Sequence, residues 1–350
     1  MMATSTLVQQ AVTQLRKCLA DVPFCTLSAG KKPRGAESQP DWVGQIRCGK
    51  RTRGILLQVK QSGQPRFVRE SVNAIARWLT QYPGAVGVFA APYVSPDAAS
   101  ILSQENMGYV DLSGNCRLCF DNVYVRIEGQ SNQFAVRRDL RSLYSPKAER
   151  VLRILLLEPQ RGWKIEELAK AAEVSLGQAA NIKKLLMDRE WLRRTDEGLR
   201  LADPGALFAE WSENYTFRKN KTWDFYSTDP LPQIEAKLVA ACSKLKLDYA
   251  FAGFSAAARW APTVRYQRVM AYVPDRIDQV AQLVGLKPVS SGPNVTLFEP
   301  YDAGVMAGCK QIEGDCVTSP VQTYLDVRSF RGRGEEAADA IFRKAIQPTW

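Results

Sequence analysis

The stretch between residues 145 and 201 is the part of the chain that most constrains its fold. Apolar residues recur there at helical spacing in three successive segments, which are Pro146–Leu157, Ile165–Ala172 and Leu176–Trp191. The residues that follow, 192–201, alternate between apolar and polar as a two-stranded hairpin does, with Asp196, Glu197 and Gly198 at its tip. We therefore predict three helices followed by a hairpin in this stretch.

This order of elements is typical of a winged helix-turn-helix, whose third helix enters the DNA major groove. Residues 175–187 contain no acidic side chain, as groove entry favours. Gln178 and Asn181 can each form two hydrogen bonds with adenine, and lysine and arginine neutralise phosphates. The predicted DNA-binding residues are Ser175, Leu176, Gln178, Asn181, Lys183 and Lys184 on the helix, and Arg193, Arg194 and Arg200 on the hairpin. The alternative is a winged helix that makes protein contacts only.

The chain is basic, and its excess charge lies near the N-terminus. It carries 47 Lys and Arg against 36 Asp and Glu, a net charge of +11. Residues 1–142 alone hold 18 basic and 10 acidic residues, which accounts for +8 of that excess. A one-sided basic balance favours a polyanionic partner, usually nucleic acid. The alternative is a basic protein without such a partner.

The sequence contains no histidine. This excludes Ser-His-Asp and Cys-His nucleophiles, two-histidine zinc sites and histidine acid–base catalysis. Eight cysteines, with no secretory signal and no run of 18 apolar residues, predict reduced thiols in a cytoplasmic protein without a membrane span. Cys116 and Cys119 have the spacing of a metal knuckle, but a structural zinc ion needs four ligands, so we predict no metal site.

Residues 1–142 are predicted to form an α/β domain, because strand-like and helix-like segments alternate along them. Asp41 is followed there by Gln58 and Lys60, which share one face of a predicted strand. In metal-dependent nucleases an aspartate and a Glu-x-Lys pair hold Mg²⁺ and activate water, and residues 23–130 resemble the restriction-endonuclease-like fold. Gln58 stands in place of the second carboxylate. We therefore predict a degenerate site without catalysis or a cofactor, and a Mg²⁺-dependent nuclease is the alternative.

The C-terminal part is predicted as a second mixed α/β domain. Its segment Gly253-Phe254-Ser255 is similar to the turn that opens nucleotidyltransferase-like cores. The spaced aspartates that hold two Mg²⁺ ions in those enzymes do not follow Ser255, which argues against transfer chemistry. The fold class is α/β multidomain, with an endonuclease-like domain, a central winged helix-turn-helix and a nucleotidyltransferase-like domain. The predicted boundaries are 1–142, 143–203, a linker helix at 204–223, and 224–350.

Several motifs of the C-terminal part follow the winged helix in a recognisable order. They are Tyr249-Ala-Phe-Ala-Gly-Phe-Ser-Ala-Ala, Pro293-Asn-Val-Thr-Leu, Ser319-Pro-Val-Gln-Thr-Tyr-Leu-Asp326 and Gly332-Arg-Gly-Glu-Glu-Ala-Ala338. With these motifs, residues 145–345 resemble the AbiEi-family antitoxins of type IV toxin–antitoxin systems. The resemblance implies a DNA-binding repressor of its own operon, whose C-terminal domain antagonises a nucleotidyltransferase-like toxin without necessarily touching it. Residues 1–142 lie outside that pattern.

Together these observations predict a DNA-binding transcriptional regulator. We expect double-stranded DNA of its own operator as one partner, a toxin encoded nearby as another, and a homodimer or higher oligomer on DNA. One alternative is a nuclease that the winged helix targets to DNA, with Asp41 and Lys60 as its metal-binding and water-activating residues. The other is an assembly protein that coats DNA with little sequence preference.

Overall fold

The computed structural model describes residues 4–20, 22–28, 30, 39–134, 143–262, 265–330 and 332–350. The chain divides into two compact units. The first comprises residues 1–140 with 187–190, and the second comprises residues 141–186 with 191–350. The second unit therefore contains the three-helix and hairpin stretch, except for residues 187–190, together with the C-terminal α/β stretch. Both units combine sheets with helices, which confirms the predicted α/β multidomain class.

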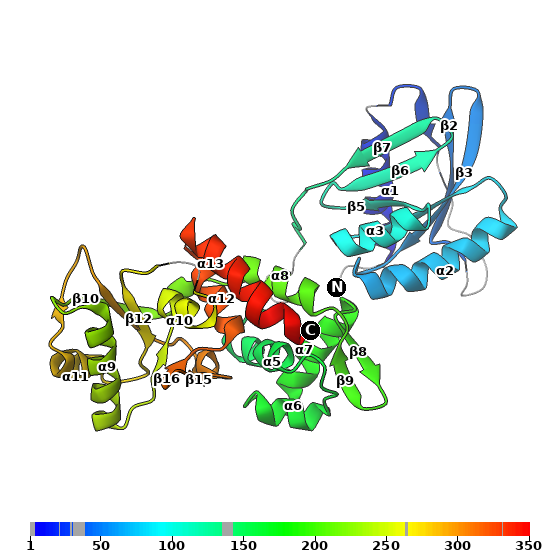
Figure 1. The fold of residues 1–350 in the computed structure, drawn as a ribbon. Coiled ribbons are helices and arrows are strands. Elements are labelled where there is room, and N and C mark those ends of the chain that lie inside the picture. The colour runs from blue at the N-terminus through cyan, green and yellow to red at the C-terminus, as the bar shows by residue number, and fades with distance from the viewer. Residues whose placement is uncertain are drawn as a thin grey trace. The chain divides into compact units, whose positions relative to one another are not determined.

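The first unit is a seven-stranded sheet with helices on both faces (Figure 1). Its elements are α1 (Thr4–Ala20), β1 (Cys25–Leu27), β2 (Trp42–Cys48), β3 (Arg51–Val59), α2 (Pro65–Gln81), β4 (Val86–Ala91), α3 (Pro96–Gln104), β5 (Gly108–Asp111), β6 (Cys116–Phe120) and β7 (Val123–Ile127). The strands lie in chain order; β3, β4 and β5 are parallel, and the other neighbours are antiparallel. Helix α1 packs on one face of the sheet, and α2 and α3 pack on the other.

Cys25 and Cys48 form a disulfide bond, so the prediction that all eight cysteines are reduced is wrong. The two residues are direct partners in the antiparallel pair of β1 and β2, with Cα atoms 4.2 Å apart. Their spacing in the sequence does not reveal this contact, because the register of two strands depends on how the sheet assembles. Cys116 and Cys119 lie in strand β6, in which Cys116 is buried and Cys119 is exposed.

The second unit begins with three helices and a hairpin, which we call the helix–hairpin segment (residues 146–201). Its elements are α5 (Pro146–Leu157), α6 (Ile165–Ala171), α7 (Leu176–Asp188), β8 (Leu192–Thr195) and β9 (Gly198–Leu201). The predicted order is confirmed, although α7 ends at Asp188 and not at Trp191. The three helices meet in an apolar interior that includes Leu152, Leu168, Ile182 and Leu186.

The predicted linker helix at 204–223 is wrong beyond its first eleven residues. Helix α8 spans Pro204–Asn214, a 3₁₀ turn η1 follows at Phe217–Lys219, and residues from Lys221 onward form a strand. This strand, β10 (Lys221–Tyr226), pairs with β14 (Val295–Glu299) through residues that are 70 or more positions apart, from Lys221 with Glu299 to Phe225 with Val295. Its β-branched and aromatic residues suit a sheet, and the long-range pairing overrides the helical pattern of the local sequence.

The remaining residues of the second unit build a mixed seven-stranded sheet in the order β13-β10-β14-β12-β11-β16-β15. The strands after β10 are β11 (Ala250–Phe251), β12 (Val269–Tyr272), β13 (Lys287–Pro288), β14 (Val295–Glu299), β15 (Lys310–Ile312) and β16 (Asp315–Val317). The helices are α9 (Leu231–Leu245), α10 (Gly253–Trp260), α11 (Ile277–Val284), η2 (Ala303–Met306), α12 (Pro320–Arg328), α13 (Arg333–Ile341), η3 (Phe342–Ile346) and η4 (Gln347–Thr349). Helices α9 and α11 pack on one face, and α10 packs on the other.

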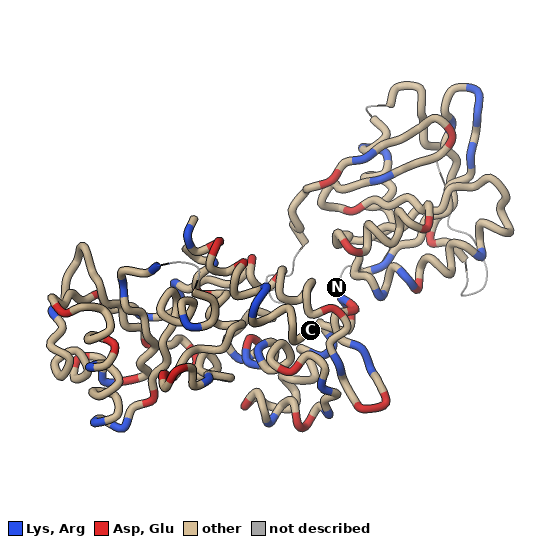
Figure 2. Tube along the Cα trace, viewed as in Figure 1, with Lys and Arg blue, Asp and Glu red and all other residues tan. Residues whose placement is uncertain are grey.

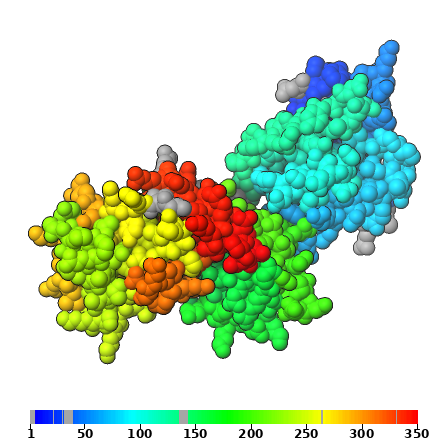
Figure 3. Space-filling view, in the orientation of Figure 1, coloured from blue at the N-terminus to red at the C-terminus, as the bar shows by residue number. Residues whose placement is uncertain are grey.

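The C-terminal residues lie against the helix that follows the hairpin. The Phe208 ring in α8 stacks on Phe342 at 6.2 Å between centroids and meets Trp350 edge-on at 5.7 Å. Figure 3 shows the red C-terminal segment in contact with the green part of the second unit. This packing and the polar contacts described below join the helix–hairpin segment to the C-terminal sheet. No helix within the described ranges is both long and apolar enough to cross a membrane.

Candidate nucleic-acid interface

Helix α7 has one buried and one exposed side. Its buried side consists of three small or apolar residues, Ala179, Ile182 and Leu186. Gln178, Asn181 and Lys184 recur at three-residue spacing on the opposite side, and all three are exposed. The two predicted base-reading residues and one predicted phosphate-binding lysine therefore form a single exposed stripe along the helix.

The first turn of α7 is closed by a reciprocal cap between Ser175 and Gln178. The Ser175 Oγ accepts a hydrogen bond from the Gln178 backbone N–H at 3.2 Å, and the Gln178 Oε1 accepts one from the Ser175 backbone N–H at 3.2 Å. Leu176, which follows the cap, is 50% exposed. The amide oxygen of Gln178 is thus already used within the helix. A contact of Gln178 with a base has to compete with this cap, which the sequence analysis did not foresee.

The hairpin separates its three arginines into two groups. Arg193 is directly opposite Arg200, whereas Arg194 is opposite Leu199. Because side chains alternate between the faces of a strand, Arg193 and Arg200 share one face and Arg194 lies on the other. Arg200 also donates a hydrogen bond to the Gln160 Oε1. Figure 2 shows basic residues along both strands and acidic residues at the tip of the hairpin.

A hollow of about 390 Å³ lies between α6, α7 and the hairpin, and Lys183 and Arg194 line it. Its acidic lining residues are Glu166, Asp196 and Glu197. Trp163 and Leu199 exchange two backbone hydrogen bonds of 2.8 Å beside this hollow, which fixes the hairpin to the preceding helices. Lys183 therefore lies with Arg194 in a mixed-charge hollow, apart from the exposed stripe of α7.

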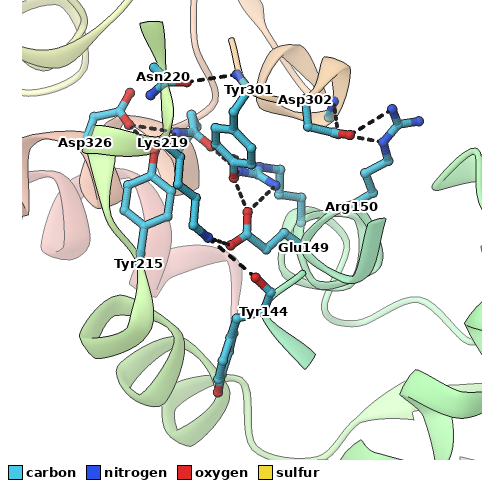
Figure 4. Close-up of polar contacts among 12 residues, drawn as sticks. Tyr144, Glu149, Arg150, Tyr215, Lys219, Asn220, Tyr301, Asp302 and Asp326 are labelled. Carbon is cyan, nitrogen blue, oxygen red and sulfur yellow. Dashed lines mark hydrogen bonds and ion pairs between the residues drawn. The ribbon is translucent and has the colours of Figure 1, made fainter. Parts of the chain in front are cut away.

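Helix α5 carries an ion pair on its buried side. The side chains of Glu149 and Arg153 are fully buried, with a nitrogen and an oxygen 3.7 Å apart. Lys219 donates to the Glu149 Oε1 at 2.8 Å, and Arg153 donates twice to the Gln322 Oε1, at 2.7 and 2.9 Å. The Tyr301 hydroxyl donates to Glu149 (Figure 4) and accepts a hydrogen bond from Arg153 at 2.9 Å. We call these five residues the polar joint, because they connect α5 to η1, α12 and the loop before η2.

Asp326, at the end of the Ser319–Asp326 motif, extends the polar joint into the C-terminal sheet. Its carboxylate accepts hydrogen bonds from Tyr215 at 2.7 Å, Gln322 at 2.7 Å and Tyr272 at 3.1 Å. Burial raises the pKa of the Asp326 carboxyl to about 7, although the three hydrogen bonds act in the opposite direction. The motif therefore has a structural role in the second unit, with a carboxyl group that titrates near neutrality.

A second link runs from the C-terminal domain to the turn before α7. Arg150 in α5 donates to both carboxylate oxygens of Asp302, at 2.6 and 3.1 Å. The same guanidinium forms an ion pair with Glu173 at 3.0 Å, and Glu173 lies in the turn between α6 and α7. The position of α7 is thus connected through Arg150 to the loop that carries Tyr301 and Asp302.

The three residues of the predicted nuclease motif lie at neighbouring strand ends in the first unit. The Asp41 Oδ2 accepts a hydrogen bond from the Val59 backbone N–H at 2.7 Å, so this carboxylate joins the start of β2 to the end of β3. The Gln58 Oε1 is buried and makes no hydrogen bond to the described residues. Lys60 is partly exposed just after β3. Among the described residues, no group of three cysteine or carboxylate side chains is placed to hold a metal ion.

A comparison with known protein families gives a match for the C-terminal two fifths of the chain. Residues 200–347 match the family model described as "Transcriptional regulator, AbiEi antitoxin, Type IV TA system". The match begins at the end of the hairpin and continues through η3, so it includes Lys219, Tyr301, Gln322 and Asp326. It confirms the resemblance for these residues, and the first unit lies outside it. No curated protein matches this chain in sequence.

Proposed function

We propose that this chain, whose residues 200–347 match the AbiEi antitoxin family, represses its own operon by binding operator DNA with its helix–hairpin segment. The exposed stripe of Gln178, Asn181 and Lys184 carries this proposal. A helix with such a stripe opposite an apolar buried side can enter the major groove as the third helix of a winged helix-turn-helix.

The positions of the polar residues suggest a division of roles. Asn181 and Gln178 are both candidates for base recognition, and a contact of Gln178 with a base would require its side-chain oxygen to leave the helix cap. Lys184 on the stripe, with Arg193 and Arg194 on the hairpin, would contact phosphates and supply affinity without sequence preference. Ser175 and Leu176 would lie at the groove edge, where the helix begins. Arg200, which Gln160 already binds, and Lys183, which is less exposed than Arg194 in the same hollow, would add less.

The C-terminal domain would antagonise a nucleotidyltransferase-like toxin, and the DNA-bound form would be a homodimer or a higher oligomer. The family match supports the antitoxin role, and the operator symmetry usual for helix-turn-helix proteins supports the dimer. The polar joint supports a coupling of the two roles, because α5 is fixed to the C-terminal domain by buried ionic hydrogen bonds.

The direct test is anisotropy titration of the full chain with the duplex upstream of its own gene and with a shuffled duplex, at two salt concentrations without Mg²⁺. We expect the operator to bind on the order of 10³-fold more tightly than the shuffled duplex. Lys184→Ala should weaken both duplexes and lower the salt slope by about one unit, while Lys244→Ala, a control on the exposed surface of α9, should not. Equal affinities for the two duplexes would contradict the regulator and favour a protein that coats DNA.

A further inference from the structure

The helices of the first unit leave part of one sheet face uncovered. Helices α2 and α3 pack on the face that includes Leu56, Phe89 and Tyr109, in β3, β4 and β5. Strands β6 and β7 extend the sheet beyond these helices, and β7 is its edge strand. Arg117 in β6 is the direct partner of Tyr109 and of Arg126 in β7, so all three side chains point to this same face.

A cavity of about 510 Å³ occupies this uncovered area, between α3 and the strands β5 to β7. Three tyrosines and three charged side chains contribute to its lining, namely Tyr93, Tyr109, Tyr124, Arg117, Arg126 and Glu128. This volume lies in the range of small-molecule and cofactor sites, about 300–1,000 Å³. The cavity is built entirely from the first unit and makes no use of the helix–hairpin segment.

The charges in the cavity are arranged to attract an anion. Arg117 and Arg126 stand directly opposite each other on neighbouring strands, and like charges in that position destabilise a sheet. Glu128 forms an ion pair with Arg126 at 2.8 Å, and this contact lowers the pKa of the Glu128 carboxyl. Arg117 donates a long hydrogen bond, 3.4 Å, to the Met107 carbonyl oxygen. Two guanidinium groups and a single carboxylate leave the lining with a positive excess.

The aromatic side chains of the cavity favour a ligand that also carries a flat apolar group. Tyr124 is 59% exposed on the edge strand β7 and contributes its ring to the lining of the cavity. Tyr93 is partly buried on the opposite side of the cavity. Glu128 accepts a hydrogen bond from the Tyr109 hydroxyl at 3.3 Å and could accept another from a ring amino group.

We propose that this cavity binds a nucleoside phosphate. Its base would stack on Tyr124, its phosphate would contact Arg117 and Arg126, and Glu128 would accept from an amino group of the base. A free nucleotide and an unpaired nucleotide within a single strand offer the same chemistry. The paired, stacked bases of a duplex cannot enter such a cavity, so the site is distinct from the proposed operator contact.

Isothermal titration calorimetry of the full chain tests this proposal, with ATP, GTP, CTP and UTP in one arm and single-stranded DNA and RNA ten-mers in the other. We expect binding in at least one arm. Tyr124→Ala should weaken it about fivefold or more through loss of stacking, and Tyr124→Phe should retain it. Arg117→Ala should weaken it roughly tenfold through loss of a charged hydrogen bond.

Two exposed residues provide matched controls, Arg77 in α2 and Tyr82 directly after it, and Tyr82→Ala and Arg77→Ala should leave the affinity unchanged. Binding of ten-mers alone would support the site and identify a strand as its ligand, and binding of nucleotides alone would identify the free form. The proposal is overturned if neither arm binds, or if Tyr124→Ala binds as tightly as the wild type. Because Tyr124 is exposed, its replacement tests the site even if Arg117→Ala fails to fold.

Discussion

Helices α5 and α7 belong to the same helix–hairpin segment, yet they place their polar side chains in opposite ways. Helix α7 buries small and apolar residues and exposes Asn181 and Lys184. Helix α5 buries the ion pair of Glu149 and Arg153 completely. Exposed polar groups remain available to a ligand at little cost in stability, whereas buried charges must be matched by fixed partners. The difference separates a surface suited to recognition from a joint that holds this surface in place.

The largest expected effect comes from breaking the polar joint on one side only. Arg153→Met should destabilise the protein by about 3–5 kcal/mol, because it leaves the buried Glu149 with fewer partners. The double variant Glu149→Leu, Arg153→Met removes both charges and should recover part of that loss. Urea unfolding at pH 7 measures both free energies of unfolding. A double variant less stable than the single one would contradict our account of the joint.

The second prediction concerns the pH dependence of the same region. Burial raises the pKa of Asp326 to about 7 in the folded protein, above its ordinary value of 3.8. The folded state therefore holds this proton more tightly, and the stabilisation is complete below about pH 4 and is lost as the pH rises to about 7. Relative to Asp326→Asn, the wild type should lose up to about 4 kcal/mol across that window. Urea unfolding of both proteins at a series of pH values measures this loss. Parallel pH profiles of the two free energies of unfolding would contradict a raised pKa of Asp326.

On the exposed side, Asn181→Ala should change recognition and leave stability unaltered. Loss of a bidentate base contact should reduce discrimination between the operator and a single-base variant by about 1–3 kcal/mol. The free energy of unfolding should stay within about 0.5 kcal/mol of the wild type, because the side chain is exposed. Anisotropy with both duplexes measures the first quantity. Equal weakening on operator and variant would place Asn181 among the phosphate contacts.

Gln178 allows the cap and the base contact to be separated. Gln178→Glu keeps an acceptor for the Ser175 N–H, so the helix cap and stability should be preserved. The added carboxylate should weaken DNA binding by charge repulsion. Gln178→Ala should lose about 1 kcal/mol of stability with the cap. Tight operator binding by Gln178→Glu would show that this residue only caps the helix.

The smallest effect is expected in the first unit. The Asp41 carboxylate accepts a hydrogen bond from the Val59 N–H, and Gln58 is neutral. We therefore expect that neither the wild type nor Lys60→Ala cleaves plasmid DNA in the presence of Mg²⁺ or Mn²⁺. Agarose gels of supercoiled plasmid detect a single nick. Nicking by the wild type that Lys60→Ala abolishes would reverse our conclusion and favour the nuclease alternative.

Elements with strong local signals were predictable from the sequence. Ser95 before Pro96 predicts the start of α3, and the Ser95 Oγ indeed accepts from the Ala98 N–H at 3.3 Å. The same holds for the three helices and the hairpin, because their periodicity is set by side chains only a few residues apart. The motifs between residues 249 and 338 are also short stretches of neighbouring residues. The family match confirms that they resemble those of AbiEi antitoxins.

The polar joint was harder to predict from the sequence. Glu149 and Arg153 are one turn apart and border the predicted apolar face of α5, which could have marked them as buried. Their partners Lys219, Tyr301 and Gln322 lie 66 or more residues away along the chain, where no periodicity connects them. The competing roles of Gln178 were also missed, although the Ser-x-x-Gln spacing of a capping box was present.

By itself the sequence determined the order of the local elements, the absence of histidine chemistry and the family of the C-terminal part. Tertiary structure decided the pairing of Cys25 with Cys48, the change from helix to strand after Asn214, and the burial of Asp326. The physical reason is the range of the interactions. Helical and strand periodicities come from neighbours within a turn or two, whereas strand register and the pairing of buried charges depend on segments that meet only when the chain has folded.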